Sequence, residues 1–143
     1  AAMLAEERAQ GIDRLETYAA FAERVRETRR ALLGLLDRLK AEGKRLIGYG
    51  ASGRAATIMN FCGIDRRYLD YIVDDTPAKQ GFYTPGTHLP IRPWSAAEDT
   101  PRPDYVLAFV WSFIDEVVRK RADYLGRGGR FIVPLPRVRL IPG

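Results

Sequence analysis

Four largely apolar stretches of the chain have the length and composition of buried β-strands. They are residues 45–49, 68–74, 104–110 and 130–136, and a shorter run at 89–92 predicts one more strand. Apolar runs without strict alternation are typical of parallel strands that are covered on both faces of a sheet. We therefore expect an open parallel sheet of about five strands.

The first forty residues show a different period. Apolar side chains recur there every three or four residues, the spacing of one face of an α-helix: Leu15, Tyr18, Ala22, Val25, Leu32, Leu36 and Leu39. Asp13 followed by Glu16 resembles a capping box, so this long amphipathic helix is expected to begin near Asp13 and to end near Gly43. Such a helix is longer than one side of a small sheet requires. It is expected to pack on a second copy of the chain, on a neighbouring domain, or wholly on its own sheet.

Shorter helices are predicted between the strands. One covers 55–62 and stops at Gly63, a short one covers 95–98, and a third follows the strand at 104–110, capped by Ser112 with Asp115 and ended by Gly126, Gly128 and Gly129. Strands that alternate with helices indicate an α/β fold with a Rossmann-like sheet, for which we predict the strand order 3-2-1-4-5. The expected organisation is a linker helix region over residues 1–43 and a Rossmann-like domain over residues 44–143.

A glycine-rich turn joins the first strand to its helix. Gly48, Gly50 and Gly53 have the G-x-G-x-x-G spacing, and Asp74 and Asp75 end the next strand, as in the dinucleotide-binding fingerprint. Free backbone amides at such a turn, together with the positive end of the helix dipole, can bind a phosphate group. The alternative is that the glycines serve only a tight turn and close packing of the helix on the sheet.

Ligands of open parallel sheets bind above the carboxyl ends of the strands where the strand order reverses. We expect Arg54 and Lys79 to contact phosphate there, Asp74 to accept hydrogen bonds from a ribose, and Trp111 to stack on a base or sugar. Each could instead be a surface, strand-end or core residue. The full set of candidate binding residues is Gly48, Tyr49, Gly50, Ala51, Ser52, Gly53, Arg54, Asp74, Lys79, Thr87, His88 and Trp111. With one histidine and no nucleophile-elbow serine, the set suits binding better than catalysis, and no catalytic residue is predicted.

Composition narrows the function further. The chain has 143 residues, 46% of them hydrophobic, and one cysteine, Cys62, which excludes an internal disulfide and a cysteine-based metal cluster. No apolar run is long enough to span a membrane and no signal peptide is evident, so a cytoplasmic location is expected. The net charge of +5 favours an acidic partner such as a nucleotide diphosphate, whereas the interleaving of bases with acids is not typical of nucleic-acid binding.

Several motifs occur in an order that resembles a known family. They are Gly48-Tyr49-Gly50-Ala51, Asn60-Phe61-Cys62-Gly63-Ile64, Asp74 with Pro77, Lys79-Gln80-Gly81, Pro85-Gly86-Thr87-His88, Pro90-Ile91, Pro103-Asp104-Tyr105-Val106, Trp111 and Phe131-Ile132-Val133-Pro134. Together they resemble the C-terminal domain of the sugar C-methyltransferases. One departure is Arg54-Ala55-Ala56, where the family pattern usually has Lys-Gly-Asn.

The resemblance implies a function that the chain would share with missing domains. Members of the family use S-adenosylmethionine to methylate a carbon of a deoxysugar carried on a nucleotide diphosphate, typically TDP. A zinc-binding domain and a middle domain, which holds the methyl donor and the acid/base residues, precede the C-terminal domain. The resemblance therefore implies a substrate-binding domain that is inactive alone and does not itself bind S-adenosylmethionine. A homodimer is a separate expectation, which comes from the length of the N-terminal helix. On the residues alone, an NAD(P)-binding module or a structural dimerisation domain without a ligand remains an alternative.

Overall fold

The computed structural model describes the backbone of residues 2–99 and 101–142, and their side chains except those of residues 2–18 and 21. The elements, in chain order, are α1 (Ala2–Ala41), β1 (Leu46–Tyr49), α2 (Gly53–Cys62), β2 (Ile72–Val73), η1 (Pro77–Lys79), β3 (Ile91–Arg92), α3 (Ser95–Glu98), β4 (Tyr105–Ala108), η2 (Trp111–Phe113), α4 (Ile114–Lys120), α5 (Ala122–Gly126), β5 (Arg130–Val133) and β6 (Arg139–Ile141). Within these ranges, no helix has the length and apolar character needed to cross a membrane.

The sheet has the order β3-β2-β1-β4-β5-β6. The pairs from β3 through β5 are parallel, so the predicted order 3-2-1-4-5 is confirmed for the first five strands. The strand order reverses beside β1, which has β2 on one side and β4 on the other. This arrangement brings the glycine turn after β1 to the centre of the sheet's carboxyl edge.

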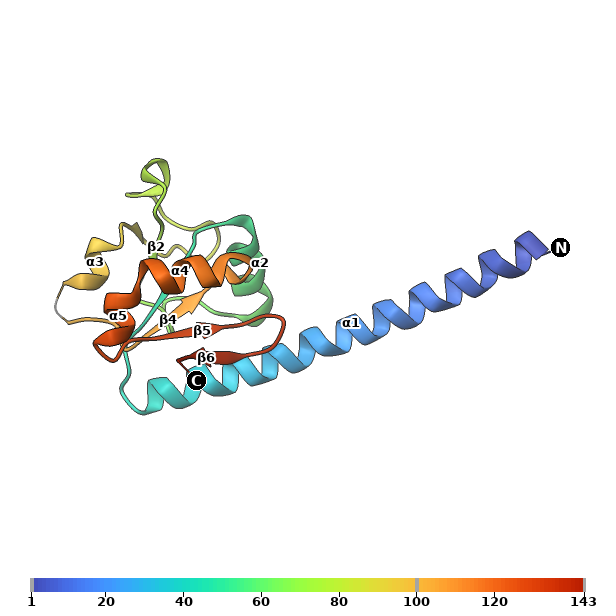
Figure 1. The fold of residues 1–143 in the computed structure, drawn as a ribbon, viewed down its shortest axis with the longest axis horizontal. Helices are drawn as coiled ribbons and strands as arrows, with labels where there is room; N and C mark the ends of the chain where they lie inside the picture. The colour runs from blue at the N-terminus through green and yellow to red at the C-terminus, as the bar shows by residue number, and fades with distance from the viewer. Residues whose placement is uncertain (1, 100, 143) are drawn as a thin grey trace.

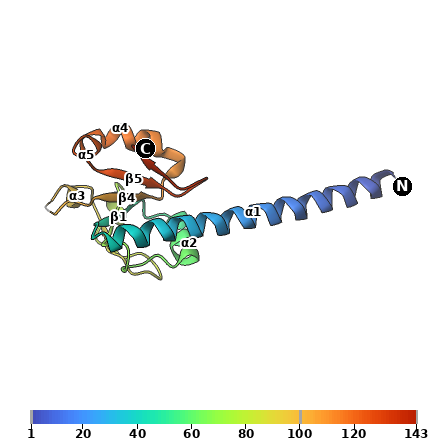
Figure 2. The same ribbon diagram turned by 90° about the horizontal axis from the view of Figure 1, so that it is seen from below.

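Apolar side chains fill both faces of the sheet, which explains the continuous apolar runs of its strands. Along β4 and the residue that follows it, Leu107 and Phe109 pack in one core cluster with α1 and α2, while Val106 and Ala108 pack in a second cluster with α4 and α5. Figure 2 shows the resulting layers, with α1 and α2 below the sheet and α4 and α5 above it. The fold is therefore a three-layer α/β arrangement.

The sixth strand corrects the prediction of about five. The chain turns back after β5, and β6 pairs with it antiparallel, with Phe131 opposite Ile141. We expected pairing to end at Pro134 and Pro136 because proline cannot donate a ladder hydrogen bond. Both prolines lie in the connection between the two strands, so they end β5 without preventing a return strand at the edge.

Two helix predictions were also wrong in detail. Helix α1 begins at Ala2 rather than near Asp13, because residues 2–10 are all strong helix formers (Ala, Met, Leu, Glu, Arg and Gln). Leu15 and Tyr18, which we expected on its apolar face, lie outside the described side chains. The helix predicted after β4 is divided into η2, α4 and α5, and α4 has no side-chain cap. Ser112 instead accepts a hydrogen bond from Arg54 at 3.1 Å.

Helix α1 extends far beyond the rest of the fold. Figure 1 shows that its C-terminal part lies along the sheet, while its N-terminal part projects away from every other element. The residues of α1 in the core cluster are Leu32, Leu36 and Leu39, all in the C-terminal part. Only about a quarter of the helix therefore contributes buried apolar anchors among the described side chains.

Candidate functional site

A crevice of about 310 Å³ opens where the strand order reverses. It lies at the carboxyl ends of β1, β2 and β4, as the topology predicted. Its walls come from five parts of the chain: Tyr49, Gly50, Ser52, Asp74, Asp75, Thr76, Lys79, Val110, Phe113, Glu116, Val117 and Lys120. The volume is near the lower end of the ~300–1,000 Å³ found for small-molecule sites, so the crevice can hold part of a nucleotide-sized ligand.

The three fingerprint glycines have three different physical roles. A Cβ atom at Gly48 would lie 2.9 Å from the Phe109 ring, so this glycine permits packing inside the sheet. Gly50 has φ +97° and a Cβ there would lie 2.6 Å from Val110, so it is required for the turn itself. No atom of a described residue lies within 4 Å of a Cβ at Gly53. Of the three positions, only Gly48 and Gly50 therefore require glycine for steric reasons. At both positions the reason is contact with the protein and not with a ligand.

The backbone amides of the turn are divided between the protein and the crevice. The Gly50 amide donates to the Val73 carbonyl at 2.8 Å, and the Ala51 amide donates to Asp74 Oδ2 at 2.8 Å. Ser52 caps α2, because its Oγ accepts from the Ala55 amide at 3.2 Å. Among the described residues, no hydrogen bond occupies the amides of residues 52–54. Some of the amides that we expected to bind phosphate thus donate to the protein itself. The amides at the start of α2 remain available to a ligand.

Asp74 holds the glycine turn to the end of β2. One carboxylate oxygen accepts from the Ala51 amide and the other accepts from the Thr76 amide, also at 2.8 Å. The residue is 8% exposed. Lys79 lies beside it, with Nζ 3.9 Å from Asp74 Oδ2 and 3.1 Å from the Ala51 carbonyl oxygen. This arrangement supports a structural role for Asp74 and leaves the exposed Lys79 ammonium at the crevice wall.

A polar cluster centred on Asp75 also lies at the crevice, and of its members only Tyr49 was among the predicted site residues. Asp75 accepts hydrogen bonds from the Tyr49 hydroxyl, from Lys120 Nζ at 3.0 Å and from Arg121 at 2.7 Å. Burial opposes ionisation of Asp75, but these donors and the Arg121 charge outweigh it and lower its pKa. Burial, together with the hydrogen bond to Asp75, raises the pKa of Tyr49 to about 12. The available signal was the second aspartate at the strand end; the sequence gives no sign that the end of α4 meets it.

Arg54 and Trp111 lie together beside the N-terminus of α2. The Arg54 guanidinium lies 5.8 Å from the centroid of the Trp111 ring and donates to Ser112. Neither side chain lines the crevice cavity itself. Both belong to elements that border it, so their predicted contacts with phosphate and base remain predictions.

Thr87 and His88 are not where we expected them. The turn that contains them packs beside Asn60, near the C-terminal end of α2, because a Cβ at Gly86 would lie 3.3 Å from Asn60 Oδ1. His88 stacks on Tyr83 with ring centroids 4.5 Å apart. Ser52, at the crevice, precedes that ten-residue helix and lies eight residues before Asn60, about 12 Å along the helix axis. The structure therefore does not bring the Thr87–His88 turn into the crevice, and a role in binding stays a prediction.

Comparison with known proteins identifies the family. Residues 1–136 match the family model described as the C-methyltransferase C-terminal domain. The chain belongs to this family. This C-methyltransferase domain is also similar to C-methyltransferase NovU from Streptomyces niveus, with 38% identity over 142 residues. The match covers 99% of the present chain but 33% of NovU, so the domain spans about a third of that relative's length.

The membership confirms the resemblance inferred from the motifs. Across residues 2–99 and 101–142, no group of three or more His, Cys, Asp and Glu side chains is placed to hold a metal ion. The C-methyltransferase domain instead offers free amides, an ammonium group and an aromatic rim. These are groups that bind and orient a ligand.

Proposed function

We propose that this domain holds the nucleotide-diphosphate sugar substrate of a C-methyltransferase, with a TDP-linked deoxysugar as the substrate. The proposal rests on one observation: the free backbone amides of residues 52–54 and the ammonium group of Lys79 lie at the same crevice. Amides at a helix N-terminus and a nearby lysine are complementary to a diphosphate. In this arrangement residues 44–143 bind the substrate and residues 1–43 connect it to the rest of the enzyme.

S-adenosylmethionine would supply the methyl group from another part of the parent enzyme. The crevice suits a diphosphate better than it suits the ribose of S-adenosylmethionine or NAD. A ribose is usually held by an acidic side chain at the end of the second strand, and here both oxygens of that side chain, Asp74, already accept backbone amides. The domain's contribution to the reaction is then to fix the sugar relative to the methyl donor, which lowers the entropic part of the barrier.

Thermal unfolding of the chain with TDP, a TDP-sugar, NAD and S-adenosylmethionine in parallel tests the proposal. A ligand at about 100 times its Kd stabilises the folded state by roughly 2.7 kcal/mol, an easily measured rise in Tm. We expect stabilisation by TDP and the TDP-sugar. Stabilisation by NAD alone would instead support a nicotinamide-binding module, and no response to any of the four would support a structural domain.

The variant Lys79→Ala tests whether TDP binds at the crevice. Removing a charge-assisted contact to phosphate costs about 1.5–3 kcal/mol, so the Kd for TDP should rise about tenfold or more. Lys44→Ala is the matched control because Lys44 precedes β1 and so lies at the opposite, amino end of that strand. Equal losses in the two variants would show that TDP responds only to net charge, and would contradict a diphosphate site at the crevice.

A further inference from the structure

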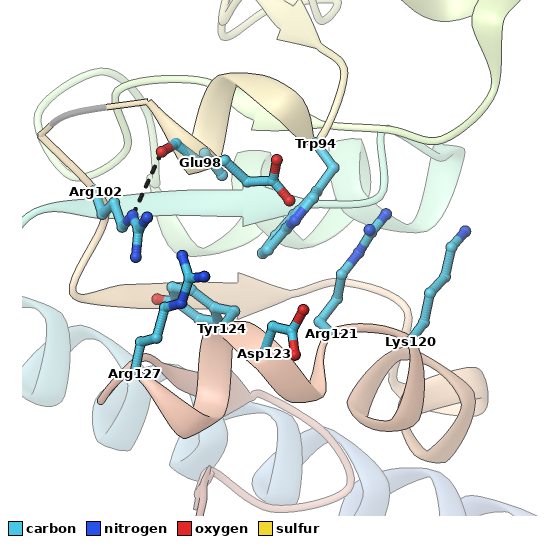
Figure 3. Close-up of a pocket in the computed structure, with 9 residues that line it drawn as sticks. Trp94, Glu98, Arg102, Lys120, Arg121, Asp123, Tyr124 and Arg127 are labelled. Carbon is cyan, nitrogen blue, oxygen red and sulfur yellow. Dashed lines mark hydrogen bonds between the residues drawn. The ribbon is translucent and has the colours of Figure 1, made fainter.

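A second cavity lies away from the glycine turn, between α3 and the pair α4–α5. It has a volume of about 230 Å³ and is lined by Trp94, Ala97, Glu98, Arg102, Lys120, Arg121, Asp123, Tyr124 and Arg127. Figure 3 shows these side chains converging from the α3 side and from α4–α5. Lys120 is the one residue that the two lining sets share. The cavity is therefore a neighbour of the crevice and not part of it.

Two arginines extend into this cavity without a carboxylate partner. Figure 3 shows the guanidinium groups of Arg102 and Arg127 directed toward each other from opposite walls. Arg102 makes one long contact, from Nε to the Glu98 carbonyl oxygen at 3.4 Å. Neither arginine forms a salt bridge with any described residue, although Glu98 and Asp123 line the same cavity. Two exposed guanidinium groups directed into one cavity form a positively charged pair that is complementary to an anion.

A third arginine forms part of the wall and has an unused donor. Arg121 is held in place, because its guanidinium donates to Asp75 at 2.7 Å and lies 4.5 Å from the centroid of the Trp94 ring. Its Nε is nevertheless buried and has no hydrogen-bond partner in the described structure. Because this Nε has almost no accessible surface, it does not face the cavity, and Arg121 contributes to the site as a fixed part of its wall. Rigid placement of Arg121 also preorganises one wall of the cavity.

The size of the cavity limits what it can hold. Its volume exceeds several times the ~30 Å³ that a water molecule occupies in the liquid. It is smaller than the ~300–1,000 Å³ of sites for drug-sized ligands. The cavity can therefore enclose a single phosphate or a diphosphate group, but not a whole nucleotide. Guanidinium groups bind phosphate through paired hydrogen bonds whose geometry matches its oxygens.

We propose that the cavity between α3 and α4–α5 is a binding site for a small phosphate anion, clamped by Arg102 and Arg127. The site is independent of the diphosphate site proposed at the crevice. Bound phosphate would bridge the two arginines and join the α3 side of the fold to α5. The anion can be free phosphate or pyrophosphate, or a terminal phosphate group on a small metabolite, and these sources share the same recognition chemistry.

Calorimetric titration of the chain with pyrophosphate at constant ionic strength tests the proposal. Because pyrophosphate can also bind at the crevice, the arginine site is titrated in the Lys79→Ala background, where we expect saturable binding at one site. In the Arg102→Gln/Arg127→Gln variant the Kd should rise by about tenfold or more for each lost guanidinium contact. Both side chains are at the surface, so the variant is expected to fold, and circular dichroism checks this. Arg119→Gln, on the exposed side of α4, controls for loss of a positive charge. Parallel titrations with phosphate, acetate and glucose 1-phosphate separate the free ion, a carboxylate and a phosphate monoester.

Three results would overturn the proposal. One is the absence of saturable binding to any phosphate compound, and another is an equal loss of affinity in the Arg119→Gln control. The third is loss of pyrophosphate binding in Lys79→Ala with full binding in the double arginine variant, which would place the anion at the crevice. The TDP titration tests the crevice separately. If pyrophosphate does not bind at the arginines, Lys79→Ala should still weaken the binding of TDP.

Discussion

Gly50 gives the turn after β1 its shape, and Gly53 does not. At Gly50, φ is +97° and an added Cβ would lie 2.6 Å from Val110 Cγ1, so Gly50→Ala adds backbone strain to a steric clash. These effects together should lower the free energy of unfolding by about 2–4 kcal/mol. Gly53→Ala is the matched control: it meets no atom within 4 Å and begins a helix, so it should be neutral or stabilise by about 0.5–1 kcal/mol. Urea denaturation of both variants measures the difference. Equal destabilisation would show that the turn does not depend on the conformation of Gly50.

The contribution of Asp75 to the free energy of unfolding depends on pH. Its pKa is lowered in the folded state, because the hydrogen bonds from Tyr49 and Lys120 and the charge of Arg121 outweigh the effect of burial. A carboxyl group with a lowered folded pKa stabilises the protein above its unfolded pKa of about 3.9, and that contribution is lost as the pH falls through the folded pKa.

Asp75→Asn should therefore be less stable than wild type near neutral pH, and the gap should narrow below about pH 4. Because the Asp75 side chain is 38% exposed, we expect a gap of only about 1–2 kcal/mol at pH 7. Tm measured from pH 3 to 8 follows it. Asp115→Asn, which removes an exposed carboxylate from α4, is the control. A gap that widens toward low pH would contradict the role assigned to Asp75.

At the scale of elements, the sequence predicted what depends on local patterns. The five parallel strands follow from continuous apolar runs, and the end of α2 at Gly63 follows from its φ of +72°, which glycine adopts easily. The place of the crevice follows from strand order alone. Strand β6 was missed because its pairing depends on a neighbour and not on its own composition. The division of the helix after β4 was missed for a similar reason, since Ser112 bonds to Arg54 and not to the helix end.

The residues of the site were predicted or missed for the same reasons. The glycine turn and Asp74 were found because they belong to one continuous strand-turn-helix pattern. Asp75, Lys120 and Arg121 meet only because β2 and α4 border the same crevice, 45 residues apart in the chain at Asp75 and Lys120. Spacing in the sequence carries no signal for such a contact. The Thr87–His88 turn was misplaced because loop composition predicts irregular backbone but not the element on which it packs.

At the scale of the whole molecule, α1 has two parts with different expected contributions to stability. Its C-terminal part places Leu36 in the core with no exposed surface, whereas its N-terminal part projects from the fold (Figure 1). Leu36→Ala should cost about 2–5 kcal/mol, as for other buried leucines. Removal of residues 1–21 should change the Tm of the rest of the chain little, because the three buried anchors of α1 all follow that segment.

Thermal unfolding and sedimentation velocity of the same truncated chain separate the possible roles of the projecting segment. If a second copy of the chain binds there, the intact chain sediments as a dimer, the truncated chain sediments as a monomer, and the Tm of the intact chain rises with protein concentration. If the segment serves only as a connection to the rest of a C-methyltransferase, both chains are monomers with similar Tm values. A large loss of stability on truncation that does not depend on protein concentration would contradict both, because it would require core contacts from the first half of α1. The half that contributes no described anchor is thus the part of this chain best placed to contact another domain or subunit.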